Sequence, residues 1–262
     1  MNTSDFNLAI SSLEGSFTKT AFFETIGSTN DVVAEWVHQG VKGMCLAAAG
    51  EQTRGRGRAG RTWQSSAGNC LAFSLLLDTE SYINQESNVL GLAALSTALA
   101  ICESLESQYG LKPEIKWPND VLLDCKKVCG ILPETEWNGD QLRSLIVGVG
   151  VNVTRNAIPT GDVLNFPATS IEEVLGDNVD QSKLFFSIVA QIVKKKMRTD
   201  LIKESENRMA YKDQEVDLVI NGNIQTATVI GLAADGGLRA QLVDGEQRVF
   251  YTGEIQLRPH AK

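Results

Sequence analysis

Four arginines lie within eight residues of a glycine-rich segment. Arg54, Arg56, Arg58 and Arg61 alternate with glycines in the run TRGRGRAGR, and no acidic residue interrupts them. Guanidinium groups bind carboxylates and phosphates, and glycines let the backbone approach a ligand closely. Because four like charges repel one another, we expect an anion-binding loop that is mobile when empty and closes when an anion supplies the missing charge.

Residues 55–60 also match the dinucleotide-binding pattern GxGxxG. That pattern requires a helix opening at the third glycine, whose N-terminus holds a pyrophosphate. Here the residues after Gly60 are polar, and residues 70–77 form a continuous apolar run typical of a strand. An RGG-type RNA-binding segment fits no better, because such segments recur in disordered tracts and this one occurs once.

Composition restricts the chemistry further. The 262 residues include only two histidines, His38 and His260, and carry 24 Lys and Arg against 32 Asp and Glu, for a formal charge of −8. Two histidines leave little basis for a histidine-based zinc site or for Ser-His-Asp hydrolysis. The acidic balance argues against a protein that coats nucleic acid or an anionic membrane. We expect the chemistry to come from Lys, Arg, Asp and side-chain amides.

The cysteines indicate a reducing compartment. Their spacings make neither a disulfide framework nor a paired CxxC zinc pattern, and the five positions are Cys45, Cys70, Cys102, Cys125 and Cys129. No secretory signal is found in residues 1–20, and the most apolar window, residues 89–102, is shorter than the roughly 20 residues that span a bilayer. We predict a cytoplasmic protein with a buried core helix at that window.

The arginine segment is predicted to be a loop between two strands. One strand ends at Phe22 and Phe23, and further strands are expected over residues 44–49 and 70–77, which leaves residues 50–69 as the loop. A helix is expected to begin at Ser28 or Thr29 and to stop at Gly40.

Most of the remaining elements are short strands. The strand-like runs are residues 114–117, 121–123, 127–132 and 144–153. They follow a helix expected over residues 88–109, with Ser87 as its cap and Gly110 as its stop, and they precede a helix expected from Asp180 to about Lys203. Short strands in quick succession favour a mixed or antiparallel sheet, so the predicted class is α+β.

The last fifty residues follow another pattern. Short strands are expected over residues 216–220, 225–232, 238–242 and 247–251, separated by turns at Asn221-Gly222, Asp235-Gly236-Gly237 and Asp244-Gly245. Four or five strands of this length make a small β-barrel, which must pack on the main domain to be stable. We expect two domains, residues 1–212 and residues 213–262.

Five short motifs lie in the first 153 residues. In chain order they are GSTND (Gly27–Asp31), EQTRGRGRAGRTW (Glu51–Trp63), KWPNDV (Lys116–Val121), KVCGIL (Lys127–Leu132) and GVGVNV (Gly148–Val153). Their order and spacing resemble those of biotin protein ligases, the biotin–[acetyl-CoA-carboxylase] ligases. The resemblance covers about Phe22 to Val153 and continues more loosely into the C-terminal segment. It implies a mixed-sheet catalytic domain of the biotin/lipoate ligase type, followed by a small SH3-like β-barrel.

The resemblance also implies a reaction. Biotin and ATP would give biotinyl-5′-AMP and pyrophosphate, with Mg²⁺ as a cofactor, and a lysine of a biotin carboxyl carrier protein would then take the biotin. About 20 residues precede the first matched strand, so we expect a monofunctional enzyme without a winged helix-turn-helix domain and without DNA as a partner. A homodimer is left open.

The resemblance assigns roles by position. The residues expected to contact biotin are Ser28, Thr29, Asn30, Gln52, Arg56, Gly57, Arg58, Lys127 and Gly130. Those expected at the nucleotide are Arg56, Arg58, Trp63, Asn119, Lys127 and Asn152, and those expected in catalysis are Lys127, Arg58 and Asp120. Asp120 is also the candidate Mg²⁺ ligand, or it orients the acceptor lysine or takes its proton.

Some of these residues also have a purely structural explanation. Ser28 and Thr29 could simply cap a helix, and Trp63 could be a core residue. Strand alternation assigns Lys126 to solvent and Lys127 to the site. At the level of function, the alternatives are a lipoate or octanoate ligase of the same fold and a non-catalytic biotin-sensing protein.

Overall fold

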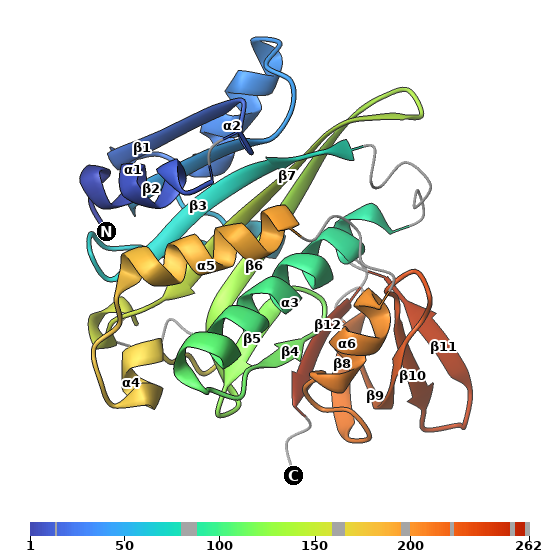
Figure 1. Ribbon diagram of the computed structural model, residues 1–262. Helices are drawn as coiled ribbons and strands as arrows, with labels where there is room; N and C mark the ends of the chain where they lie inside the picture. Colours follow the sequence, from blue (N-terminus) through green and yellow to red (C-terminus); the bar gives the residue numbers. More distant parts are fainter. Residues whose placement is uncertain are drawn as a thin grey trace.

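Seven strands form the central sheet of the protein (Figure 1). The computed structural model describes residues 1–13, 15–79, 88–158, 166–194, 200–220, 223–251 and 255–259. The strand order is β1-β2-β3-β7-β6-β5-β4. The strands are β1 (Lys19–Ile26), β2 (Cys45–Gln52), β3 (Cys70–Leu77), β4 (Glu114–Lys116), β5 (Asp120–Leu123), β6 (Lys126–Asn138) and β7 (Gln141–Asn152). Since β1 and β2 are parallel and the other pairs antiparallel, the predicted mixed sheet and α+β class are confirmed.

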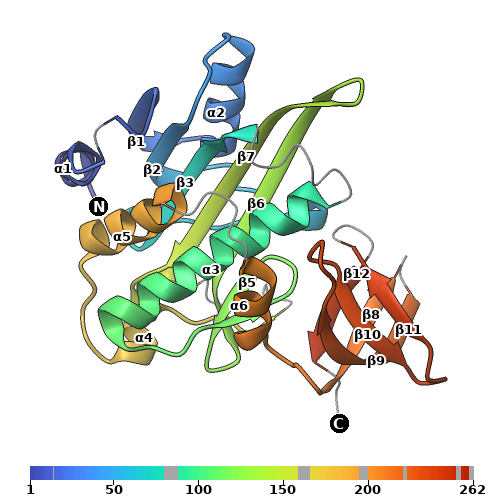
Figure 2. The ribbon, with the colours of Figure 1, turned by 45° about the vertical axis from the view of Figure 1, so that its right-hand side comes forward.

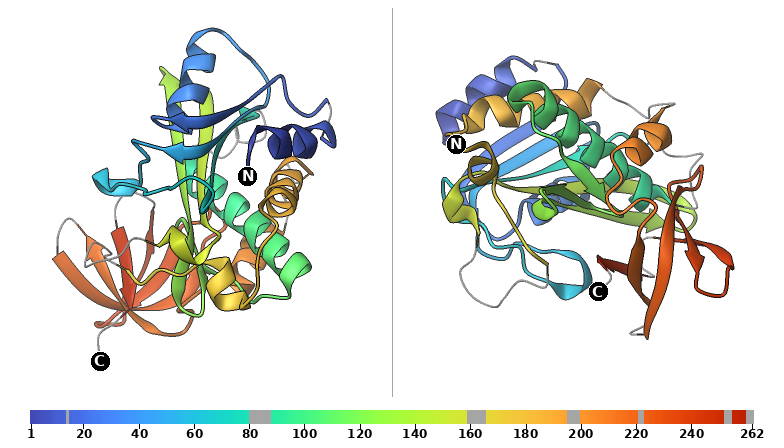
Figure 3. Two further views of the ribbon diagram at one scale, coloured as in Figure 1. Left: turned by 90° about the vertical axis from the view of Figure 1, so that its left-hand side faces the viewer. Right: turned by 90° about the horizontal axis from the view of Figure 1, so that it is seen from below.

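Helices cover the two faces of this sheet unequally (Figure 3). Helices α1 (Thr3–Ser11), α3 (Val89–Tyr109) and α5 (Gln181–Lys194) pack on one face, and α2 (Thr29–His38) packs on the other. Alternation along β2 produces this division: Leu46 belongs to the large core under α3, and Ala47 belongs to the small core under α2. The arginine loop, residues 53–69 between β2 and β3, lies on the face of the sheet that carries α2.

Helix α3 is the core helix that the sequence predicts. Its 21 residues are long and apolar enough to cross a membrane by length and composition, but most of them are buried inside the molecule. Asn88 occupies its N-cap position, and Ser87, the expected cap, lies outside the described residues. The helix ends as predicted at Gly110, whose φ of 64° is the left-handed conformation that glycine adopts at little cost.

A second sheet of five antiparallel strands lies beside the first (Figure 2). Its order is β11-β10-β9-β8-β12, with β8 (Glu215–Ile220), β9 (Asn223–Leu232), β10 (Leu238–Leu242), β11 (Gln247–Phe250) and β12 (Ile255–Pro259). Between the edge strands β11 and β12, the described residues show no pairing that would close a barrel. The expected turn at Asn221-Gly222 lies outside the described residues.

The second sheet packs on the first domain, as expected. Trp117 Nε1 donates a hydrogen bond to the Gly236 carbonyl oxygen at 3.0 Å, and Asn88 Nδ2 donates to the Asp235 carbonyl oxygen at 3.0 Å. The turn between β9 and β10 is therefore anchored both to the start of α3 and to the segment that joins β4 and β5.

Three helices differ from the sequence prediction. Helix α1, with the capping box of Asn2 and Asp5, and the short α4 (Ile171–Leu175) were not expected. The helix predicted from Asp180 to about Lys203 is wrong in extent, because α6 (Leu201–Asn207) is a separate helix with Asp200 at its N-cap. Asp180 does cap α5, since its carboxylate accepts from two backbone N–H groups of the first turn.

Candidate functional site

One cavity of about 700 Å³ collects every residue that the sequence assigned to a site. It lies between the first turn of α2, the arginine loop and strands β5, β6 and β7. The thirteen assigned residues in its lining are Ser28, Thr29, Asn30, Gln52, Arg56, Gly57, Arg58, Trp63, Asn119, Asp120, Lys127, Gly130 and Asn152. Residues up to 124 positions apart in the chain therefore share one site.

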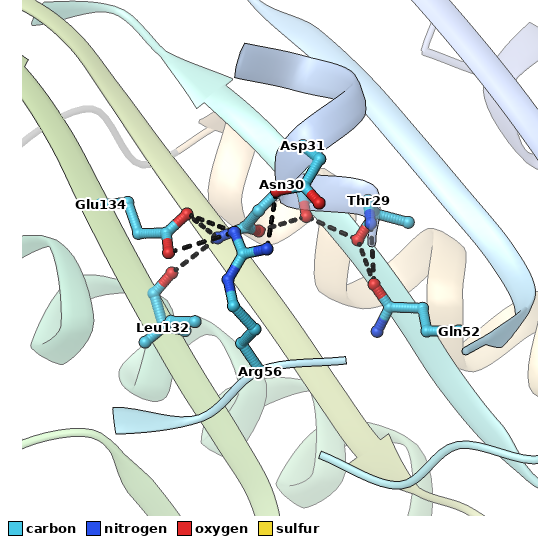
Figure 4. Close-up of polar contacts among 8 residues, drawn as sticks. Thr29, Asn30, Asp31, Gln52, Arg56, Leu132 and Glu134 are labelled. Carbon is cyan, nitrogen blue, oxygen red and sulfur yellow. Dashed lines mark hydrogen bonds and ion pairs between the residues drawn. The ribbon is translucent and has the colours of Figure 1, made fainter. Parts of the chain in front are cut away.

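The end of the cavity beside α2, here called the polar end, presents the hydroxyl and amide groups of Thr29, Asn30 and Gln52 (Figure 4). The Thr29 backbone N–H donates to Gln52 Oε1 at 2.7 Å, and Thr29 Oγ1 lies 3.0 Å from the same oxygen. Asn30 Oδ1 accepts from Ser74 Oγ at 2.5 Å. Ser28 occupies the N-cap position of α2 but makes no side-chain cap hydrogen bond, so its hydroxyl is left for other partners.

One of the four arginines in the loop, Arg56, is neutralised by two acidic residues. This differs from the expectation that the charges of the empty loop lack partners. Arg56 Nη1 lies 2.6 Å from Asp31 Oδ1, and its Nη2 lies 3.2 Å from Glu134 Oε2 (Figure 4). Burial alone would lower the pKa of Arg56, but these two carboxylates raise it. The neutralising acids come from α2 and β6, which the spacing within the loop could not reveal.

Arg58 points to the opposite end of the cavity. Its Nη1 donates to Asn119 Oδ1 at 3.0 Å, and burial lowers its pKa even though Asp120 opposes that shift. A 3₁₀ turn begins at Arg58 and places Ala59 at a φ of 55°. Residues other than glycine, Asn and Asp seldom adopt this conformation, so the turn is a defined feature of the loop.

Two lysines share one buried carboxylate at the charged end. Lys127 Nζ lies 2.6 Å from Asp120 Oδ1, and Lys116 Nζ lies 3.6 Å from Asp120 Oδ2. Burial alone would raise the pKa of Asp120, but the two ammonium groups outweigh it and hold that pKa below its usual value. Burial lowers the pKa of Lys116. With Arg58 close by, this end of the cavity carries more positive than negative charge.

Strand alternation separates the two adjacent lysines as predicted. The Lys127 side chain lines the cavity and is 24 % exposed, whereas that of Lys126 is 48 % exposed and lies 3.9 Å from Glu173. The prediction that Lys126 faces solvent is therefore confirmed.

Trp63 packs closely against two glycines of the sheet. A Cβ atom on Gly150 would overlap the indole ring, and one on Gly130 would lie 3.2 Å from Trp63 Cζ3. Lys127 Nζ is 5.7 Å from the centre of the ring, and Trp63 Nε1 is buried without a hydrogen-bond partner. An orphaned buried donor in a cavity wall is a polar group that a ligand could satisfy.

The oxygen atoms that could hold a metal ion at the charged end are already engaged by basic side chains. Asp120 is already engaged by two ammonium groups, and Asn119 Oδ1 accepts from Arg58. Among the described residues, no group of three His, Cys, Asp or Glu side chains is placed to hold a metal ion. Mg²⁺ takes few protein ligands and can take phosphate and water oxygens instead. We therefore treat Asp120 as an ion-pair partner.

Sequence reasoning missed four residues around the cavity. Lys116 lines the charged end, while Ser74, Asp31 and Glu134 hold residues of the polar end. Ser74 carried a signal that could have been used, because it is the one hydroxyl in the fully buried strand CLAFSLLL and must find a partner there. Asp31 and Glu134 are far from the arginines in sequence.

Family models match both parts of the chain. The model described as the Biotin/lipoate A/B protein ligase family matches residues 22–152. The model described as the Biotin protein ligase C terminal domain matches residues 213–258.

Individual relatives agree with these matches. The chain is 28 % identical over 242 residues to the bifunctional ligase/repressor BirA of Bacillus spizizenii, covering 89 % of this chain and 72 % of that protein. It is 36 % identical over 159 residues to a biotin–[acetyl-CoA-carboxylase] ligase of Paracoccus denitrificans, covering 58 % of this chain and 62 % of that one. The structure is similar to a biotin protein ligase from Aquifex aeolicus in complex with biotin and ATP, with a TM-score of 0.77, 31 % identity and coverage of 93 % and 100 %.

Proposed function

The chain belongs to the biotin/lipoate A/B protein ligase family, and from that premise we propose that it is a biotin–[acetyl-CoA-carboxylase] ligase. The biotin carboxylate attacks the α-phosphate of ATP, which gives biotinyl-5′-AMP and releases pyrophosphate. A lysine amine of the acceptor then attacks the mixed anhydride, forms an amide and releases AMP. The observation that carries this proposal is a single cavity with one end lined by hydroxyl and amide groups and the other end cationic.

The polar end favours biotin over other carboxylic acids. The ureido ring of biotin presents N–H donors and a carbonyl acceptor, which suit the hydroxyl and amide groups of Ser28, Thr29 and Gln52. A dithiolane ring or an alkyl chain would offer no partner to the Ser28 hydroxyl or the Gln52 amide nitrogen, at a cost of about 1–3 kcal/mol for each group that it buries. Lipoate and octanoate are therefore the poorer fits to this cavity.

The cationic end suits the first step of the reaction. Biotin carboxylate and the α-phosphate are both anionic, so bringing them together requires fixed positive charge. Lys127 and Arg58 supply that charge in our proposal. Lys116 adds a second ammonium group beside the Asp120 carboxylate. Asp120, whose lowered pKa makes it a weak base, positions the two lysines rather than removing a proton.

The other lining residues would border the ligands. We propose that Trp63, Asn119 and Asn152 lie along the nucleotide, and that Gly57 and Gly130 let the backbone approach biotin. Asn152 Nδ2 already donates to the Thr169 carbonyl oxygen at 3.1 Å, which leaves its amide oxygen and its second N–H for a ligand. Arg56 contributes chiefly by its pairing with Asp31 and Glu134, which ties the loop to the polar end.

The acceptor in this proposal is a biotin carboxyl carrier domain of acetyl-CoA carboxylase or a related carboxylase. The name of the Paracoccus denitrificans relative supports this choice. We further propose that residues 1–212 form the catalytic domain and residues 213–262 a C-terminal domain, which agrees with the family match to residues 213–258. A cytoplasmic location, the absence of DNA as a partner and a homodimer stay predictions.

A two-stage experiment tests the proposed function. The protein is incubated with biotin and ATP labelled at the α-phosphate, bound product is isolated by gel filtration, and a carrier domain is then added without further ATP. We expect labelled biotinyl-5′-AMP to elute with the protein and biotin to appear on the carrier lysine. A carrier with that lysine changed to arginine is the control and should stay unmodified. Adenylate that forms but never transfers would indicate a biotin-sensing protein, and no adenylate would refute the proposal.

A further inference from the structure

Asp120 lies between two lysines that come from the strands on either side of it. It is on β5, Lys116 is its register partner on β4, and Lys127 is on β6 (Figure 1). Each carboxylate oxygen faces one ammonium group, since Oδ1 lies 2.6 Å from Lys127 Nζ and Oδ2 lies 3.6 Å from Lys116 Nζ. The first contact is a close ion pair, and the second is too long for a hydrogen bond. Lys116 is therefore a second counter-ion that can still move closer to the carboxylate.

The two lysines are not equally free to turn toward a ligand. The Lys116 side chain is 11 % exposed, and its Nζ lies 4.7 Å from the centre of the Phe166 ring, which adds a cation–π contact to the ion pair. The Lys127 side chain is 24 % exposed, and its distance to the centre of the Trp63 ring is longer, at 5.7 Å. Lys127 is thus the ammonium group that can turn to an anion, while Lys116 is held beside Asp120.

The reacting anions compete with Asp120 for Lys127. In the proposed function, Lys127 contacts the biotin carboxylate and the α-phosphate, and its ammonium group must turn away from Asp120 to do so. Burial alone would raise the pKa of Asp120, but the two lysines lower it, so the buried carboxylate is ionised and needs a counter-ion throughout. Arg58 is directed elsewhere, because its Nη1 donates to Asn119 Oδ1. The cation already beside the other carboxylate oxygen is Lys116.

We propose that Lys116 is a positioning residue that takes over the Asp120 carboxylate when Lys127 turns to the reacting anions, and so frees Lys127 for catalysis. The inference rests on the proposed function, which identifies those anions as the biotin carboxylate and the α-phosphate of ATP. Without Lys116, the turn of Lys127 toward the ligand would leave a buried charge unpaired. Adenylation then slows although Lys127 itself is intact. Removing the Asp120 charge as well releases Lys127 again.

Biotin-dependent exchange of labelled pyrophosphate into ATP tests this inference with the full chain as wild type, Lys116→Met, Asp120→Asn and the double variant. We expect Lys116→Met to lower kcat at least about tenfold and to leave the KM for ATP within about threefold of wild type. Asp120→Asn should lower kcat in the wild-type background, because Lys127 loses its anchor, but raise it at least about fivefold in the Lys116→Met background. Lys112→Met removes an exposed lysine four positions earlier and should stay near wild type.

A crystal structure of the wild-type protein with a stable adenylate adds a test that does not depend on the folding of any variant. The probe is an analogue of biotinyl-5′-AMP in which a CH₂ group replaces the acyl carbonyl and the phosphate is kept. We expect Lys116 Nζ to approach Asp120 Oδ2 to about 2.8 Å, while Lys127 Nζ leaves Oδ1 for the phosphate.

Four results would overturn the inference. In the crystal structure, they are a Lys116 that leaves Asp120 for the phosphate and a Lys127 that stays on Asp120. In the exchange assay, one is a higher KM for ATP in both Lys116→Met and the double variant, as expected of a side chain that binds the triphosphate directly. The other is an Asp120→Asn change that fails to raise kcat in the Lys116→Met background, or raises it equally in both backgrounds. Wild-type protein that shows no biotin-dependent exchange would refute the proposed function itself.

Discussion

Lys127 is the single side chain on which the proposed chemistry depends most. Its ammonium lies 2.6 Å from Asp120 and, unlike its exposed neighbour Lys126, lines the cavity. We expect Lys127→Ala to reduce biotin-dependent ATP turnover by at least about a hundredfold, because a fixed charge at the developing anionic centre is lost. Pyrophosphate release measures the effect. Lys126→Ala, a control that removes an equal charge at the surface, should stay near wild type, and near-normal turnover in Lys127→Ala would refute the assignment.

Asp120 makes the protein's stability depend on acidity. Its carboxylate pairs with Lys127 and Lys116, which hold its pKa below the usual value against the opposing effect of burial. A lowered folded-state pKa stabilises the fold fully above the unfolded-state pKa of about 3.9, and the contribution is lost as pH falls through the folded value. Asp120→Asn should cost about 3 kcal/mol at neutral pH, since it leaves two partly buried lysines without their partner.

Urea unfolding of wild type and Asp120→Asn between pH 7 and pH 2.5 measures this dependence. The difference in unfolding free energy should stay constant down to the ordinary titration range of aspartate and shrink only below it. A difference that already shrinks between pH 7 and pH 5 would contradict the direction of the shift.

At the scale of elements, strand β7 divides the cavity between its two ends. A Cβ atom on Gly148 would overlap Asn30 Oδ1, and one on Gly150 would overlap the Trp63 ring. We expect Gly148→Ala to raise the KM for biotin and leave the KM for ATP near wild type. Gly150→Ala should do the reverse, because it displaces the indole. Each variant is the control for the other, and steady-state kinetics that show the same effect for both would contradict this division.

The local sequence pattern was sufficient to predict those elements whose conformation is determined by their own residues. β3 was predicted to its exact ends, because eight consecutive apolar or small residues bounded by polar ones are typical of a strand buried on both faces. β6 and β7 were predicted too short, since residues 133–138 of β6 and 141–143 of β7 form the outer part of a hairpin whose polar residues give no strand signal. Helix α1 was missed although Asn2 and Asp5 form a capping box, because its apolar residues are few.

The residues of the site could be predicted from the sequence, but the ion pairs and hydrogen bonds among them could not. All thirteen residues that the motif resemblance assigned line the cavity, whereas the partners of Arg56 lie 25 and 78 positions away in the chain. No spacing rule reports contacts between such distant elements. The expectation of unpaired charge in the arginine loop was wrong for Arg56 for this reason, and that of a loop closing on an anion stays a prediction.

At the scale of the whole molecule, the second sheet is coupled to the segment that carries Asp120. Trp117, which is 1 % exposed, donates to the Gly236 carbonyl oxygen across the contact between the sheets. Trp117→Phe should lower the free energy of unfolding by about 2 kcal/mol, because it leaves a buried carbonyl without a donor and reduces packing. Trp137→Phe, at a side chain that is 45 % exposed, should change it by less than about 0.5 kcal/mol. Chemical denaturation measures both, and equal effects would contradict the coupling.

The central claim is that the cavity activates biotin as an adenylate. Exchange of labelled pyrophosphate into ATP, with biotin, lipoate or octanoate as the acid, tests it most directly, because exchange requires reversible adenylation and no acceptor protein. We predict exchange that depends on biotin and is not inhibited by equimolar lipoate or octanoate. Exchange with lipoate or octanoate but not with biotin, or none with any of the three acids, would contradict the account.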